Sequence, residues 1–190
     1  VAGCDNVVFA GNDGVDTFLV EGNSQGADRF AGGAGHDSIL GSEGDDVIRI
    51  TRFRDDDTVE TIDGGAGVNL LRGTNSGNTL DFSGTLLTNI TRIEGGGGHD
   101  TLTGSAGDDV IVGGTGNDVL SGGDGDDVFL VEGSEQGSDR FRGEAGFDTL
   151  RGGDGDDVLQ MTRFRDEDTV EAIDGGRGTN VIQGTNSGNT

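Results

Sequence analysis

Aspartate is the residue whose spacing in this chain suggests chemistry. In residues 95–130 it recurs every nine residues, at Asp100, Asp109, Asp118 and Asp127. The surrounding pattern is Gly-Gly-x-Gly-x-Asp-x-U-x, where U is a large apolar residue. Carboxylates and the carbonyl oxygens of glycine-rich turns suit Ca²⁺, which takes six to eight oxygen ligands, whereas Mg²⁺ demands stricter geometry and Zn²⁺ prefers Cys and His. The spacing therefore predicts a series of calcium sites.

The same pattern predicts the elements that hold these aspartates. It is clean at 32–40, 95–103, 113–121, 122–130 and 152–160, with close variants at 11–19, 41–49, 104–112 and 143–151. Only two or three residues per unit favour strands, while the glycines allow tight reversals. Two units make a coil of about 18 residues, and stacked coils pair their strands in parallel about 4.8 Å apart. We expect an all-β parallel roll with a thin apolar core and aspartates stacked in the turns.

Composition indicates that the chain needs a cation. Its 190 residues include 40 glycines and 36 acids against 12 basic residues, so the net charge is -24, and only 30% are hydrophobic. Such a chain has too little apolar surface to offset the entropy of ordering. Its charge argues against nucleic acid as a partner and favours cations. The sequence has no apolar run of membrane-spanning length, and its single Cys4 has no internal disulfide partner.

A second repeat has a period of 111 residues. Residues 11–79 align without gaps on 122–190, and 45 of the 69 aligned pairs are identical, including TRFRD at 51–55 and 162–166. We therefore expect residues 1–190 to form one continuous roll, an excerpt of a tandem array whose first copy is 11–121 and whose partial second copy is 122–190. Divided into eleven half-coils, each copy is expected to make five and a half turns, which places Asp16 and Asp127 on opposite edges.

The nonapeptides resemble those of the RTX (repeats-in-toxin) family, as in GGAGHDSIL at 32–40, GGTGNDVLS at 113–121 and GGDGDDVFL at 122–130. The resemblance implies a right-handed parallel β-roll (β-helix or solenoid) with several Ca²⁺ ions in the turns. It also implies type I secretion from a Gram-negative bacterium, with folding by calcium outside the cell.

The predicted metal ligands are the motif aspartates. Two half-coils apart, they are expected to pair as Asp16 with Asp37, Asp28 with Asp46, Asp100 with Asp118, Asp109 with Asp127, Asp118 with Asp139, Asp127 with Asp148, and Asp139 with Asp157. Between residues 51 and 94 the motif aspartate is lost. Asn69 and its counterpart Asn180 are expected to hold the bend through side-chain hydrogen bonds, with weak cation sites as the alternative.

The sequence favours a structural function over a catalytic one. His36 and His99 occupy a variable position of the motif, no serine has a nucleophile context, and there is no lysine. The long repeat suits a calcium-stiffened rod in a secreted surface, matrix or filament protein, an adhesin for example, that associates with itself end to end or laterally through its Arg-Phe steps. The alternative is a calcium-dependent secretion and folding module of an exoenzyme or toxin. An ice-binding roll is disfavoured, because TNSGNT recurs only once per 111 residues.

Overall fold

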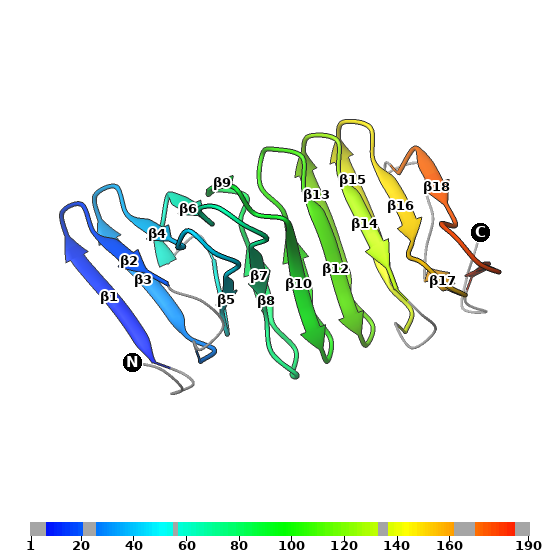
Figure 1. The fold of residues 1–190 in the computed structure, drawn as a ribbon, viewed down its shortest axis with the longest axis horizontal. Helices are drawn as coiled ribbons and strands as arrows, with labels where there is room; N and C mark the ends of the chain where they lie inside the picture. Colours follow the sequence, from blue (N-terminus) through cyan, green and yellow to red (C-terminus); the bar gives the residue numbers. More distant parts are fainter. Residues whose placement is uncertain (1–6, 21–25, 55–56, 133–136, 162–169, 185–190) are drawn as a thin grey trace.

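The protein is a parallel β-solenoid. The computed structural model describes residues 7–20, 26–54, 57–132, 137–161 and 170–184, and every strand pair in these segments is parallel. The strands lie across a single long axis, with the N-terminus on the left of Figure 1 and the C-terminus on the right. The predicted all-β roll is confirmed. Within the described residues no helix is long and apolar enough to cross a membrane.

Two sheets run along the solenoid. Sheet II contains, from one end to the other, β5 (Val47–Arg49), β7 (Leu70–Arg72), β10 (Arg92–Gly97), β12 (Val110–Thr115), β14 (Val128–Val131), β16 (Thr149–Gly152) and β18 (Ala172–Asp174). Sheet I faces it, with β8 (Thr79–Asp81), β11 (Thr101–Thr103), β13 (Val119–Asp124) and β15 (Arg140–Ala145). Two pairs form separate two-stranded sheets: β1 (Val8–Asp13) with β3 (Arg29–Ala34), and β17 (Val158–Met161) with β19 (Val181–Gly184).

A third sheet was not predicted. Sheet III is formed by β2 (Thr17–Leu19), β4 (Ser38–Leu40), β6 (Thr61–Asp63) and β9 (Leu86–Thr88). Between β3 and β10 the chain passes through sheets I, III and II in turn, so these coils have three sides. From β11 to β16 it alternates between sheets I and II, as expected for a two-sided roll. The coil length changes accordingly: hydrogen-bonded turns lie 23 residues apart at Asp46 and Asn69 but 18 apart at Asp100 and Asp118.

The third sheet changes the number of turns that one 111-residue copy makes. Asp16 follows β1 and Asp127 follows β13, and Figure 1 shows both turns along the same upper edge. The stacking steps between these strands number five: β1 on β3, Asp28 and Gly33 on Ile50 and Thr58, Phe53 on Leu80, β8 on β11, and β11 on β13. The predicted five and a half turns, with these aspartates on opposite edges, are therefore wrong. The count failed because it treated every strand as half of a coil.

The core is one column of apolar side chains per sheet. Strands show the pattern of a buried central residue between two partly exposed ones, as in β4, β7 and β8. Ile48, Leu71 and Ile93 are consecutive members of the sheet II column, and each is fully buried. The Arg-Phe steps at 29–30, 52–53 and 140–141 bury their rings, since Phe30, Phe53 and Phe141 are buried; the step at 163–164 lies outside the described residues.

Candidate calcium sites in the turns

The motif aspartates form ladders along the turn edges. In each step the backbone N–H of one aspartate donates to Oδ1 of the aspartate one coil later. This bond joins Asp16 to Asp37, Asp100 to Asp118, Asp109 to Asp127, Asp118 to Asp139 and Asp127 to Asp148, over 2.8 to 2.9 Å. These five predicted pairs are therefore neighbours in the structure. The ladder fixes the orientation of each carboxylate, because one oxygen is committed to the neighbouring coil.

The second carboxylate oxygen, Oδ2, does not take part in these stacking bonds. Oδ2 is buried and has no hydrogen-bond partner among the described residues in six of the motif aspartates: Asp16, Asp37, Asp100, Asp118, Asp127 and Asp148. A buried polar atom without a partner costs about 1–3 kcal/mol, and more if it is charged. Because the same unpartnered oxygen recurs along the solenoid, these oxygens are candidate ligands of a bound cation.

Glycine creates the space around this oxygen. A Cβ placed on Gly95 would lie in steric conflict with Asp100 Oδ2 and with the carbonyl oxygen of Gly113, which belongs to the next coil. The same two kinds of oxygen converge at Gly122, from Asp127 and Gly143. The first glycine of the motif is therefore required because a carboxylate oxygen and a carbonyl oxygen occupy the space that a side chain would fill.

Burial makes these carboxylates costly to ionise without a cation. Removal from water raises the pKa of Asp127 to about 7 and that of Asp100 to about 6, and neighbouring carboxylates add to both. Burial also raises the pKa of Asp139 to about 7, and the pKa values of Asp109, Asp118 and Asp148 are raised mainly for the same reason. A bound divalent cation would reverse this preference by stabilising the charged form.

The oxygens at each turn fit calcium. Within the described residues no three Asp, Glu, His or Cys side chains gather as a metal cluster. The other candidate metal ligands beside each carboxylate are backbone carbonyl oxygens from the stacked turns, which are hard ligands of the type Ca²⁺ uses. A search restricted to side chains would therefore miss these sites.

Comparison with known families agrees with this geometry. A family profile, the RTX calcium-binding nonapeptide repeat, matches in four copies at residues 23–49, 92–129 and 135–160. The chain is an RTX repeat protein. RTX nonapeptide repeats bind Ca²⁺, and the RTX β-roll is a structural calcium-binding domain rather than a catalytic one. Searches of curated proteins and of solved structures each found no match.

Two predicted pairs in this RTX protein are wrong. Asp28 is not stacked on Asp46: its Oδ1 accepts the N–H of Val7, and it bridges to Ile50. Asp46 donates its N–H to Asn69 Oδ1 instead. The equivalent pair of Asp139 and Asp157 fails in the second copy, where Asp139 N–H bonds the carbonyl of Gln160 and Asp157 N–H bonds Asn180 Oδ1. In the first copy the physical cause is the third sheet, which places the Asp46 turn at a different corner from Asp28.

Asparagine closes some turns through hydrogen bonds of its side-chain amide. At Gly64 the Nδ2 group of Asn69 occupies the place that an aspartate Oδ2 has elsewhere, and it donates to the carbonyl oxygens of Gly65, Ala66 and Asn89 at 3.0 to 3.3 Å. Asn180 similarly donates to Arg177 O. The side-chain hydrogen bonds predicted for these two bends are therefore present.

Three further residues extend the ladders and were not predicted. Asn78 begins a ladder, because its N–H donates to Asp100 Oδ1. Glu60 Oε2 accepts the N–H of Asp37 at 2.7 Å, and Glu171 Oε2 accepts that of Asp148 at 2.8 Å. Their turns lack the nonapeptide. The only signal in the sequence is the register: each glutamate follows its aspartate by 23 residues, one three-sided coil.

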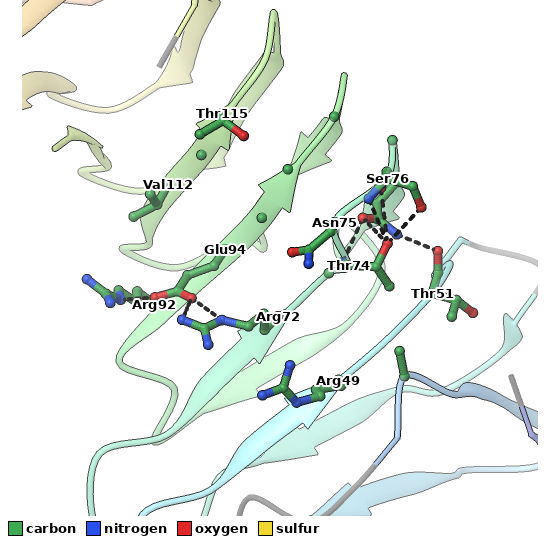
Figure 2. A pocket seen from close by; sticks show the side chains of 18 of the residues that line it. Arg49, Thr51, Arg72, Thr74, Asn75, Ser76, Arg92, Glu94, Val112 and Thr115 are labelled. Atoms are coloured by element: carbon green, nitrogen blue, oxygen red, sulfur yellow. Dashed lines mark hydrogen bonds and ion pairs between the residues drawn. The ribbon is translucent and has the colours of Figure 1, made fainter. Parts of the chain in front are cut away.

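A groove of about 970 Å³ crosses the outer face of sheet II. Figure 2 shows Arg49, Arg72 and Arg92 in a row on neighbouring strands, with Glu94 between the last two. Glu94 is buried and pairs with both Arg72 and Arg92. Two guanidinium groups thus neutralise one buried carboxylate on this face of sheet II, in contrast to the turns with unpaired carboxylates.

Proposed function

We propose that this chain is a calcium-folded segment of a structural rod in a secreted bacterial surface, matrix or filament protein. The observation that carries the proposal is the row of buried, unpartnered Oδ2 atoms in the motif turns. Each requires a cation before the coils around it become stable. Calcium then supplies the stabilisation that the thin core lacks, and it does so where calcium is abundant, outside the cell.

The long repeat supports a rod rather than an isolated module. The five coils from β1 to β13 bring the chain back to the same edge, so a further copy continues sheet I in the same phase. Continuation of the array, or end-to-end association between copies, would extend the parallel pairing of the strands. Lateral contact through the exposed parts of the Arg-Phe edges is a second route to assembly.

Calcium titration of the isolated chain tests the proposal. In chelator at neutral pH we expect an expanded polyanion with little β-sheet circular dichroism. At roughly 10⁻⁴ to 10⁻³ M calcium, as in other extracellular modules, it should fold cooperatively into a rod visible by small-angle scattering. Full β structure in chelator, or binding of fewer than about four ions, would contradict it.

The parent reading frame separates the rod from the alternative function. A calcium-dependent secretion and folding module of a type I-secreted exoenzyme or toxin would use the same folding switch. Many tandem copies of the 111-residue unit support the rod, whereas an adjoining catalytic domain supports the module.

A further inference from the structure

The turn that ends at Glu60 reproduces a motif turn without its sequence. In the motif turns, Oδ1 of the next aspartate accepts the N–H of the preceding one, as Asp37 does for Asp16 at 2.8 Å. Glu60 Oε2 performs this role for Asp37 at 2.7 Å. The ladder therefore continues one step beyond the last nonapeptide, with a carboxylate in the next position.

The oxygens around this turn match those of a motif turn. Asp37 is fully buried and its Oδ2 has no hydrogen-bond partner among the described residues. A Cβ on Gly32 would conflict with both Asp37 Oδ2 and the carbonyl oxygen of Thr58. At Gly11, one coil earlier, the corresponding atoms are Asp16 Oδ2 and the carbonyl oxygen of Gly32. Thr58 thus presents its carbonyl where a motif glycine would.

Thr58 adopts this position at a conformational cost. Its φ of 50° lies in the left-handed region, which a β-branched residue rarely occupies. The hydroxyl compensates in part, since Thr58 Oγ1 accepts the N–H of Gly33 at 2.7 Å. The strained backbone is the means by which a turn without glycine directs its carbonyl toward Asp37.

The charge at this turn also differs from that of the asparagine turns. Asn69 satisfies the facing carbonyls with its own amide hydrogens, so no cation is needed there. Glu60 has no such hydrogens, and the basic group near it is His36, 3.9 Å away and largely exposed. The other buried acid of this segment, Asp57, is already paired with Arg29. The negative charge of Asp37 and Glu60 therefore remains to be balanced.

We propose that Asp37, the Thr58 carbonyl and Glu60 form a calcium site outside the nonapeptide motif. Asp148 and Glu171 form its counterpart in the second copy, where Glu171 accepts the N–H of Asp148 and Asp148 Oδ2 is likewise buried and unpartnered. Each glutamate thus ends a calcium ladder with a bound ion. This inference rests on the proposed function, because it assumes that the motif turns bind calcium.

The test compares the number of calcium ions bound by the full chain and by Glu60→Gln/Glu171→Gln, measured by isothermal titration calorimetry. Glutamine keeps the length of the side chain and an oxygen for the N–H bond but removes the charge. We expect the variant to bind two fewer ions while the β-sheet circular dichroism in calcium is retained. The matched control is Glu43→Gln/Asp154→Asn, which removes the same charge from exposed, homologous positions of the two copies and should leave the number of ions unchanged.

An unchanged number of ions in the glutamate variant would overturn the inference. A wild-type chain that binds no calcium would instead overturn the proposed function. If the variant does not fold, a crystal structure of the wild-type chain grown in calcium decides. An ion between Asp37 and Glu60 supports the site, and ions confined to the nonapeptide turns refute it.

Discussion

The backbone N–H of Asp109 donates to Oδ1 of Asp127, 18 residues further along the chain, over 2.8 Å. One carboxylate therefore has two separate tasks. Its Oδ1 fixes the stacking of two coils, while its Oδ2 faces the space above Gly122 and the carbonyl of Gly143. Substitutions that separate these tasks can distinguish the strand register from the cation requirement.

Asp127→Asn should remove cation binding without removing the stacking bond. The amide keeps an oxygen for the N–H of Asp109 but replaces Oδ2 by an NH₂ group. We expect at least one fewer calcium ion by isothermal titration calorimetry, with β-sheet circular dichroism in calcium unchanged. Asp124→Asn is the matched control, because it removes an exposed charge from the same turn. Equal ion counts in the two variants would show that Asp127 is not a ligand.

Asn69→Asp should have the opposite effect. The change removes the hydrogen bonds from Nδ2 to three carbonyl oxygens and turns a carboxylate toward them. We expect the metal-free state to lose about 1–3 kcal/mol and the calcium-bound state to gain one ion. Thermal unfolding in chelator and calorimetry in calcium measure the two effects. The exposed Asn75→Asp adds the same charge as a control, and an Asn69→Asp chain that behaves like it would contradict the role assigned to the amide.

Gly113→Ala should destabilise the calcium-bound fold. A Cβ at this position meets Asp118 Oδ2, although φ is not in the left-handed region, so the effect is one of space and not of backbone strain. We expect a loss of roughly 2 kcal/mol or more in calcium, measured by denaturant unfolding. Gly107→Ala is the control, since the nearest atom to its Cβ would be Ser105 Oγ at 3.8 Å. Similar midpoints for both variants would refute the space requirement.

The metal-free state should depend on pH in a defined direction. Burial raises the folded-state pKa of Asp100 to about 6 and those of Asp127 and Asp139 to about 7, whereas the ordinary value is 3.8. Between these values the folded chain binds more protons than the unfolded chain, so its stability falls as the pH rises from about 4 to about 7. In chelator, β-sheet circular dichroism should be stronger at pH 5 than at pH 7.5.

Protons and calcium compete for the same oxygens, so the apparent calcium affinity should rise over this interval. At pH 5 the chain is still above its isoelectric point of about 4.1, which limits aggregation as an explanation. A metal-free β signal that grew with pH would contradict the assignment.

The dimensions of longer arrays test the coil count. Five coils per copy at about 4.8 Å each predict an advance of about 24 Å per 111 residues. Small-angle scattering of chains with two and four complete copies in calcium should show their lengths differing by about 48 Å. Electron microscopy should show equivalent turns of successive copies on the same edge of the solenoid. If these turns alternated between the two edges, each copy would contain five and a half coils and not five.

Much of the fold was predictable because the nonapeptide encodes a local structure. The glycines, the aspartate and the apolar residue each meet a requirement within one turn, as at Gly95, Asp100 and Leu102. These requirements repeat, so the strands, the inward residues and five of the aspartate pairs followed from spacing alone.

The number of sheets was not predictable in this way. The units at 32–40 and 41–49 both contain a full or nearly full motif, yet β4 enters sheet III and β5 enters sheet II. A local turn does not specify whether the next strand lies opposite the last one or beside it. That choice is made by coils stacked above and below, including contacts such as that of Phe53 with Phe82. The ladder ends at Glu60 and Asn78 were missed for the same reason, since their roles depend on a residue one coil away.

The return of Asp127 to the edge of Asp16 has a consequence for valency. Because a copy contains a whole number of coils, a site on β1 or β3 of the first copy recurs on the same face of the next copy, on β13 or β15, at a fixed interval. A long array therefore presents a single-sided, evenly spaced strip instead of a spiral of sites. Weak contacts along such a strip can all engage one flat surface simultaneously, and the avidity then increases with the number of copies without any change in the individual contact.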